Sequence, residues 1–340
     1  MPGIRILMPI VQEWRRRRGN MLWSAGMDVL SDILDTLRFR SSLYFTTDFR
    51  KPWGVTVPAY SNVARFHLVV SGECWVRLAA TGEATRLRSG DLVMIPHGAS
   101  HVLADTPRRE GVAVDDILLQ HGVDGDGRLR YGGDDDRSSA RLVCGHFEFE
   151  DASHLFVNAL PASIVARREE APGLTSIDLL LQLVAGEADA AREGSRFVLK
   201  RLAEVLFIQV LRHWHQHDGT SEGGLLSAIR DRHVGRCLKA VHAATDQGWT
   251  VEAMAREAGL SRTAFAERFR RLVGQAPMHY LTQWRIQRAR LLLQESDLSI
   301  ERIAAAVGYQ SPAAFARAFR KITGQSPGSI RRGAGPAALR

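Results

Sequence analysis

The chain has 340 residues, of which 45% are hydrophobic and 24% are charged. This is the composition of a globular protein, and the length favours two domains over one. No run of about 18 apolar residues occurs, which predicts no membrane partner, and three cysteines are too few for a disulfide framework. We therefore expect reduced thiols and a cytoplasmic protein.

The formal net charge of +8 is unevenly distributed along the chain. Residues 225–340 carry 19 Lys and Arg against 8 Asp and Glu, whereas residues 1–224 carry 26 against 29. A basic C-terminal part joined to a mildly acidic remainder indicates a module that binds a polyanion such as nucleic acid. A solvated basic surface without such a partner would have the same charge.

The N-terminal segments differ in pattern. Residues 1–26 carry four consecutive arginines after a short apolar stretch, which is the reverse of the order in a secretory signal, and we expect a disordered extension. Residues 27–38 are predicted to form a short amphipathic helix, because their apolar side chains recur at helical spacing.

Residues 42–150 have the pattern of β-strands. Short runs rich in Val, Phe, Tyr and Thr are separated by turn signals such as Ser71–Gly72 and Pro96–His97–Gly98. Closely spaced short strands are typical of a sandwich or a barrel. Residues 123–139 are rich in glycine and aspartate and are predicted to form a loop.

After residue 150 the apolar period changes from that of a strand to that of a helix. Residues 174–187 and 195–216 are predicted helices, and the second carries an apolar stripe. That stripe would either pack on the barrel or form a dimer interface. Residues 216–224 are polar and glycine-rich, which predicts a linker.

Two stretches in the C-terminal part repeat each other at an offset of 50 residues. The first is GLSRTAFAERFRRLVGQAP, residues 259–277, and the second is GYQSPAAFARAFRKITGQSP, residues 308–327. Each stretch follows a short amphipathic helix that ends at a glycine, and each has a serine where an N-cap belongs. A helix, a glycine turn and a second helix form the pattern of a helix-turn-helix.

Residues 239–333 resemble the double helix-turn-helix DNA-binding domain of the AraC/XylS family of bacterial transcription regulators. The second repeat is similar to the family's signature, and the helix between the units, residues 279–294, belongs to the same pattern. The resemblance implies a sequence-specific transcription regulator that binds double-stranded DNA. It also implies RNA polymerase as a partner if the protein is an activator. The operator, and whether the protein activates or represses, are not specified by the sequence.

On the family pattern, the exposed start of the second helix in each unit contacts base edges in a major groove. The first unit offers polar side chains there, whereas the alanines of the second give only apolar contacts, for instance to a thymine methyl group. Basic side chains further along suit phosphates, which position the protein without specifying sequence. For any single residue, a solvated helix face is the alternative. The candidates are Arg262, Thr263, Ala266, Glu267 and Arg270 in the first unit, and Pro312, Ala313, Ala316, Arg317, Arg320 and Lys321 in the second.

Two motifs in the strand-rich region resemble those of the cupin barrel. GDLVMIPHGASH, residues 90–101, is similar to the second cupin motif, and HLVVSGECWVRL, which begins at His67, is similar to a degenerate first motif. Catalytic cupins usually present two histidines, a glutamate and a later histidine to a metal, but Val69 replaces the second histidine here. Residues 28–215 are similar to the cupin-type sensor of some AraC-like regulators, which implies an unknown small-molecule effector and a homodimer.

Three side chains on separate predicted strands are candidate metal ligands: His67, His101 and Cys144. Imidazole and thiolate would suit one zinc ion or a similar transition metal. The opposite faces of two of these strands, however, are the more apolar ones, so the candidates would point away from a barrel whose interior is apolar. The alternative is a hydrogen-bonded histidine and an inert buried thiol.

These observations together predict an α+β chain of two domains that is not an enzyme. A cupin-like β-barrel with following helices, which senses an effector and dimerises, is expected over residues 27–215. The linker at 216–224 leads to the double helix-turn-helix domain at 225–333, and residues 334–340 form a tail. The second hypothesis, from a different class, is a cupin metalloenzyme with a helical appendage, which would need a complete set of metal ligands.

Overall fold

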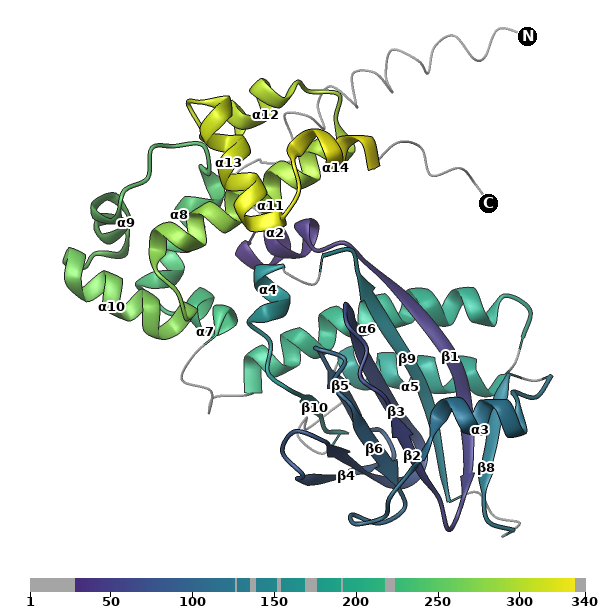
Figure 1. Cartoon of the computed structure of the whole chain (residues 1–340). Coiled ribbons are helices and arrows are strands. Elements are labelled where there is room, and N and C mark those ends of the chain that lie inside the picture. Colours follow the sequence, from purple (N-terminus) through teal and green to yellow (C-terminus); the bar gives the residue numbers. More distant parts are fainter. Residues whose placement is uncertain are drawn as a thin grey trace, which may run out of the picture. The chain divides into compact units, whose positions relative to one another are not determined.

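The computed structural model describes residues 28–125, 127–134, 139–151, 154–168, 176–190, 192–217 and 224–333. The expected N-terminal extension, the tail and most of the linker lie outside these residues. By packing, the chain divides into two units (Figure 1). Of the described residues, the helical unit comprises 28–36 and 224–333, and the β-rich unit comprises those between 37 and 217.

The β-rich unit contains ten strands, among the described residues, that join in one sheet. Their order is β7-β2-β6-β3-β9-β1-β8, with β4 and β5 also paired to β3, and β10 paired to β5. This is the half-barrel of the predicted cupin-like domain. The strands are β1 (Phe39–Arg50), β2 (Gly54–Val57), β3 (Val63–Leu78), β4 (Ala84–Arg88), β5 (Leu92–Ile95), β6 (His101–Ala104), β7 (Val112–Ala113), β8 (Arg128–Gly132), β9 (Ala140–Phe149) and β10 (Ile164–Ala166).

Strand β3 is the centre of this sheet. Its first half pairs with β9 and β5, and its second half pairs with β4 and β6. The turn predicted at Ser71–Gly72 is therefore wrong, because the strand continues through these residues with an irregularity in its pairing to β9. Gly72 has a φ of +77°, and a Cβ atom there would lie 2.0 Å from the carbonyl oxygen of Ser139. The turn signal in the sequence marks a close approach between two strands.

Two long helices complete the β-rich unit. Helix α5 (Ser176–Ala190) packs against α6 (Ser195–His217), and α6 also packs on strand β1 (Figure 1). Phe207 of α6 lies with its ring centroid 4.8 Å from that of Phe147 on β9, and Phe147 stacks on Phe66 of β3 at 5.1 Å. The helix thus covers an aromatic face of the sheet. The shorter helices of this unit are α3 (Val114–His121) and α4 (Leu155–Asn158).

The helical unit contains both predicted helix-turn-helix units. The first is formed by α9 and α10, the second by α12 and α13, and the long helix α11 joins them, as the sequence predicted. The helices of the C-terminal segment are α7 (Leu225–Arg230), α8 (Val234–Ala243), α9 (Val251–Ala258), α10 (Arg262–Val273), α11 (Pro277–Glu295), α12 (Ile300–Ala306), α13 (Pro312–Thr323) and α14 (Pro327–Gly333).

The helix predicted over residues 27–38 is present as α2 (Val29–Thr36), but it packs within the helical unit, against α7, α8 and α11. Its Asp32 carboxylate lies 3.3 Å from Nδ1 of His242 on α8, and Nε2 of that histidine lies 2.7 Å from the hydroxyl of Tyr280 on α11. All three side chains are buried. A fragment that begins at residue 225 would therefore lack one of the helices that cover this core.

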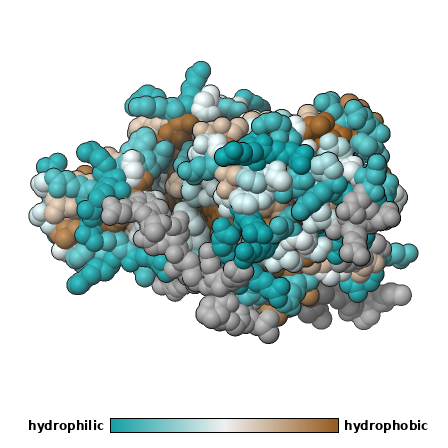
Figure 2. All heavy atoms as spheres, turned by 90° about the horizontal axis from the view of Figure 1, so that it is seen from below, coloured by the Kyte–Doolittle hydropathy of each residue, from teal (hydrophilic) through white to brown (hydrophobic). Residues whose placement is uncertain are grey.

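The described helices and one face of the surface bear on whether a segment of the chain could cross a membrane. None of the described helices is both long enough and apolar enough to cross a bilayer. Figure 2 shows one face of the molecule, on which hydrophilic side chains predominate and hydrophobic side chains gather in separate small patches. Of the large hydrophobic side chains that are exposed, five lie on α5 and α6: Leu179, Leu183, Phe197, Val198 and Val205.

Candidate functional site

The two helix-turn-helix units are built in the same way. Helix α9 ends at Gly259, which adopts a left-handed conformation with φ +65°, and Gly308 has φ +84° in the equivalent turn. Each second helix then begins at a serine whose hydroxyl accepts a hydrogen bond from a backbone N–H three residues later: Ser261 from Ala264, and Ser311 from Ala314. Left-handed glycines and N-caps at matching positions set the start of each helix.

Phenylalanines fix which face of each helix is covered. Phe265 and Phe269 of α10, and Phe315 and Phe319 of α13, are each no more than 1% exposed. Because they are four residues apart, they lie on one side of the helix and leave the opposite side to solvent. In the second unit, both rings belong to a core cluster with Ile286 of α11.

The structure brings the predicted DNA-contacting residues of each unit to the uncovered side of one helix. The side chains of nine are exposed and those of two alanines are half-buried. This arrangement suits contacts with a groove, and the half-buried alanines leave space for close approach. The exposed residues are Arg262, Thr263, Glu267, Arg270, Pro312, Ala313, Arg317, Arg320 and Lys321, and the half-buried ones are Ala266 and Ala316.

Two ion pairs tie α10 of the first unit to neighbouring segments. Arg262 at the start of α10 pairs with Glu252 of α9 at 2.8 Å, and both side chains are exposed. Arg268 pairs with Asp231, which also accepts hydrogen bonds from two backbone N–H groups at the start of α8. The hydrogen bond from Arg268 lowers the pKa of Asp231 to about 2. Sequence reasoning missed this pair, since its members are 37 residues apart and Asp231 lies outside the repeated stretches.

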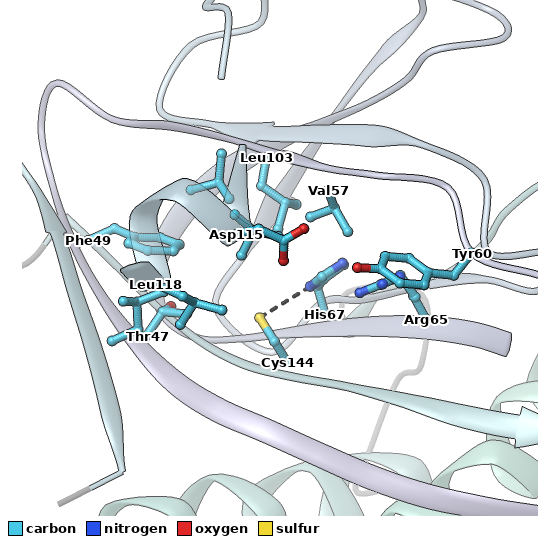
Figure 3. A pocket seen from close by; sticks show the side chains of 13 residues that line it. Thr47, Phe49, Val57, Tyr60, Arg65, His67, Leu103, Asp115, Leu118 and Cys144 are labelled. Atoms are coloured by element: carbon cyan, nitrogen blue, oxygen red, sulfur yellow. Dashed lines mark hydrogen bonds between the residues drawn. The ribbon is translucent and has the colours of Figure 1, made fainter. Parts of the chain in front are cut away.

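The β-rich unit contains a cavity of about 190 Å³, which we call the sensor cavity (Figure 3). Most of its wall is apolar, whereas its polar groups include a cation, an acid, a phenol and a thiol. A mixed wall of this kind is typical of small-molecule sites. The lining residues are Thr47, Phe49, Val55, Val57, Tyr60, Arg65, His67, Leu103, Val114, Asp115, Leu118, Leu129 and Cys144.

Sequence reasoning missed several polar residues of this wall. The guanidinium carbon of Arg65 lies 4.4 Å from the ring centroid of Tyr60, and Figure 3 shows both side chains at the same end of the cavity as His67. Arg65 is only 6% exposed. The arginine in VARFHLVV, a stretch that is apolar apart from His67, was the available signal, because an arginine is rarely buried unless it is paired.

The three candidate metal ligands do come together in the β-rich unit. Nδ1 of His67 lies 3.2 Å from Sγ of Cys144, and Nε2 of His67 lies 2.8 Å from Nε2 of His101. Nδ1 of His101 lies 2.8 Å from the carbonyl oxygen of Ala99. Burial lowers the pKa of His67 well below its ordinary value, lowers that of His101 to about 4 and raises that of Cys144 to about 12. All three groups are therefore neutral at pH 7.

As the structure places them, these three side chains do not present their ligand atoms to one common point. Cys144 and His101 contact opposite nitrogens of the His67 ring, and one imidazole cannot present both nitrogens to the same ion. Within the residues that the structure describes, no group of three or more His, Cys, Asp and Glu side chains is arranged to hold a metal ion. Glu73, the glutamate of the degenerate cupin motif, is exposed and pairs with Arg86.

The face of the strands that points inward differs from the one that the sequence favoured. His67 and Cys144 line the cavity, whereas Phe66 and Phe147 point to the outer face. Phe207 of α6 covers that outer face. The more apolar side of these strands is therefore outside the barrel, because a helix buries it there.

Comparison with known proteins identifies both parts. A family model described as "Cupin" matches residues 28–216, and one described as "Helix-turn-helix domain" matches residues 254–333. A protein from Streptomyces lividans, named as an AraC-like transcription regulator, is 30% identical over 90% of this chain and 98% of its own. The transcriptional regulator AlkR of Acinetobacter baylyi is 30% identical over 88% of this chain and 98% of its own length.

Among solved structures, the DNA-binding domain of the transcription factor AdpA in complex with a target DNA is 32% identical to this chain. The match covers 30% of this chain and 93% of that domain, with a TM-score of 0.30. The two sequence relatives are both named as transcription regulators, so the comparisons do not favour the cupin metalloenzyme hypothesis.

Proposed function

Because the chain belongs to the AraC-type transcription regulators that carry a cupin N-terminal domain, we propose that it reads DNA with α10 and α13 and responds to an effector in the sensor cavity. The observation that carries the proposal is the pair of repeated units, each with phenylalanines on one side of its second helix and basic side chains on the other. Action in the cytoplasm is part of the proposal, and double-stranded DNA as the partner supports it.

The two second helices have different roles in reading the operator. Helix α10 offers polar side chains, among them Thr263 and Glu267, and a carboxylate accepts a hydrogen bond from a cytosine amino group. Helix α13 offers Ala313 for a thymine methyl and Arg317 for guanine. Two such helices on one chain fit successive major grooves about 34 Å apart. The basic residues Arg270, Arg320 and Lys321 hold phosphates.

Binding of the full chain to DNA is the first test. The operator is selected from random duplexes, and the dissociation constant is then measured for the operator and for random DNA at several salt concentrations. We expect affinity to fall steeply with salt, because phosphate contacts release counterions. Arg108→Ala, which removes an exposed arginine of the β-rich unit, is the control variant and should bind both DNAs as the wild type does. Binding that is absent, or independent of salt, would overturn the proposal.

The effector is proposed to be a small organic molecule that shifts the population of DNA-binding states. The size and the largely apolar wall of the sensor cavity support this part of the proposal. Two neighbouring leucines of α3 provide a matched test, since Leu118 lines the cavity and Leu119 is 85% exposed. A ligand bound in the cavity raises the melting temperature. Leu118→Trp should abolish this rise because the larger side chain fills the cavity, whereas Leu119→Trp should leave the rise unchanged.

A homodimer through α5 and α6 is the third part of the proposal. Part of the apolar stripe of α6 is buried, at Leu206 and Val210, but Val198 and Val205 are more than 40% exposed. Leu179 and Leu183 of the adjacent helix α5 are exposed too. A face of this kind fits a second copy of the chain. Leu183→Glu should weaken the dimer at least about 10-fold in sedimentation equilibrium, while the control Leu119→Glu should not. RNA polymerase is a further partner if the protein activates transcription.

A further inference from the structure

The hydrogen bonds around Cys144 have only one consistent direction. The carbonyl oxygen of Ala99 can only accept, so Nδ1 of His101 carries a proton and donates it there. Nε2 of neutral His101 then accepts from Nε2–H of His67. Nδ1 of His67 is left without a proton, so it accepts from the thiol of Cys144 at 3.2 Å. These hydrogen bonds form a chain from the thiol of Cys144 through His67 and His101 to Ala99, which we call the relay.

In geometry this arrangement is that of a nucleophile beside its base, although burial disfavours both the thiolate and the cationic histidine. A thiol in hydrogen-bond contact with a base, with the base oriented by a third group, is the general signature of nucleophilic chemistry. Here Cys144 is the nucleophile, His67 is the base and His101 orients it. Cys144 and His67 both line the sensor cavity, and Figure 3 shows their contact at its wall. A molecule in the cavity would meet the sulfur directly.

We propose that the sensor cavity captures a small α,β-unsaturated carbonyl compound by covalent addition to Cys144, with His67 as the base. The carbon chain of such a compound suits the apolar wall formed by Val57, Leu103 and Leu118. Its carbonyl oxygen, which becomes negative as the sulfur adds, suits the end of the cavity where Arg65 lies over Tyr60. This inference rests on the effector role given to the cavity in the proposed function.

The addition balances without an oxidant or a metal. The sulfur of Cys144 bonds to the β-carbon of the compound while its proton passes to Nδ1 of His67. The electron pair of the C=C bond moves to the α-carbon and the carbonyl oxygen. The α-carbon then takes the proton back from His67, so that S–H has been added across C=C. During the step His101 accepts from Nε2–H of the cationic His67, which stabilises that cation.

The burial of Cys144 makes the reaction selective. Burial keeps the pKa of this thiol well above pH 7, so the group is not a general scavenger of electrophiles. It reacts only when a compound fits the cavity beside His67. The thiols of Cys74 and Cys237 are buried too, but neither lines the cavity. They are matched internal controls.

The test exposes the folded full-length chain to methyl vinyl ketone and follows the modification of each cysteine by peptide mass mapping. Butan-2-one, which has no conjugated double bond, is the control compound. We expect one adduct at Cys144, formed at least about 10-fold faster than at Cys74 or Cys237. His67→Gln should slow it about 100-fold, as expected for loss of a general base. His97→Gln, at an exposed histidine, should leave the rate unchanged.

Equal rates at the three cysteines, or a rate that does not change in His67→Gln, would overturn the inference. Cys144→Ser, which keeps a hydroxyl for the relay, should fold and show no adduct. DNA binding of the adduct is measured separately. An adduct at the expected rate that leaves DNA binding unchanged would support the chemistry and overturn the effector role of the cavity. A failure of DNA binding in the unmodified protein would overturn the proposed function alone.

Discussion

The two units of the protein hold their functional side chains in opposite ways. In the helical unit, the residues proposed to read DNA are exposed on helices whose other sides are fixed by phenylalanines. In the β-rich unit, the thiol and imidazoles of the relay are buried and hydrogen-bonded to one another. Function and stability are therefore separable on the helices, where a side chain can change without disturbing the core. In the cavity the same side chains serve both.

The largest expected effect tests whether the residues for stability and those for DNA binding are separate within a single helix. Phe319→Ala removes a fully buried ring that contacts Phe315, and should lower the free energy of unfolding by about 4 kcal/mol. Arg320→Ala, at the next residue but exposed, should change it by less than about 0.5 kcal/mol. Urea denaturation of both variants gives the comparison, and similar losses would break the division of α13 into two faces.

The buried relay predicts a dependence of stability on pH. Burial lowers the pKa of His101 from 6.5 to about 4, so between these pH values the unfolded chain binds a proton that the folded chain does not. The free energy of unfolding should therefore fall as the pH falls through this window, by about 3 kcal/mol from this group. Urea denaturation of the wild type and of His101→Gln between pH 7 and pH 4 measures it. If the free energy of unfolding depended on pH in the same way in both proteins, the claim that His101 is neutral in the folded chain would be contradicted.

Arg317 tests the exposed side of the comparison. Arg317→Ala should weaken binding to the selected operator by about 1–3 kcal/mol, because a bidentate contact with guanine is lost, while the free energy of unfolding is unchanged. Titrations with the operator and with random DNA separate the two roles of an arginine. A loss of equal size on both DNAs would assign Arg317 to a phosphate.

The smallest expected effect concerns the Asp231–Arg268 pair, which ties α10 to the start of α8. Asp231→Asn should lower the free energy of unfolding by about 1 kcal/mol at pH 7, since Arg268 is partly exposed and the pair is screened. The lowered pKa of Asp231 means that this contribution is lost as the pH falls from about 4 towards 2. Thermal unfolding of Asp231→Asn at several pH values measures this, with Asp297→Asn, at an exposed aspartate, as the control.

The helix-turn-helix units could be predicted from the sequence because their determinants are local. A left-handed glycine, a serine N-cap and phenylalanines four residues apart lie within one short segment, and they fix both the turn and the covered face. The exposure of Thr263 and Arg317 follows from that spacing alone. The positions of the candidate DNA-contacting residues needed no knowledge of distant packing.

The inner face of the barrel and the place of α2 could not be predicted in this way. Both faces of β3 carry buried residues, since His67 lines the cavity and Phe66 stacks on Phe147 of β9, which Phe207 of α6 contacts. Alternation of apolar residues therefore does not identify the interior. Helix α2 was predicted, but its partner His242 is 210 residues away in sequence from Asp32. Only the fold brings such groups together.

The most direct measurement is methylation interference of the full chain on its selected operator. Methylation of guanine N7 blocks contacts in the major groove, so the account predicts interference in two segments about 10 base pairs apart, one for α10 and one for α13. In Arg317→Ala, interference at one guanine of one segment should disappear. A single segment, or interference that Arg317→Ala leaves intact in both, would contradict the claim that both repeated helices read the DNA.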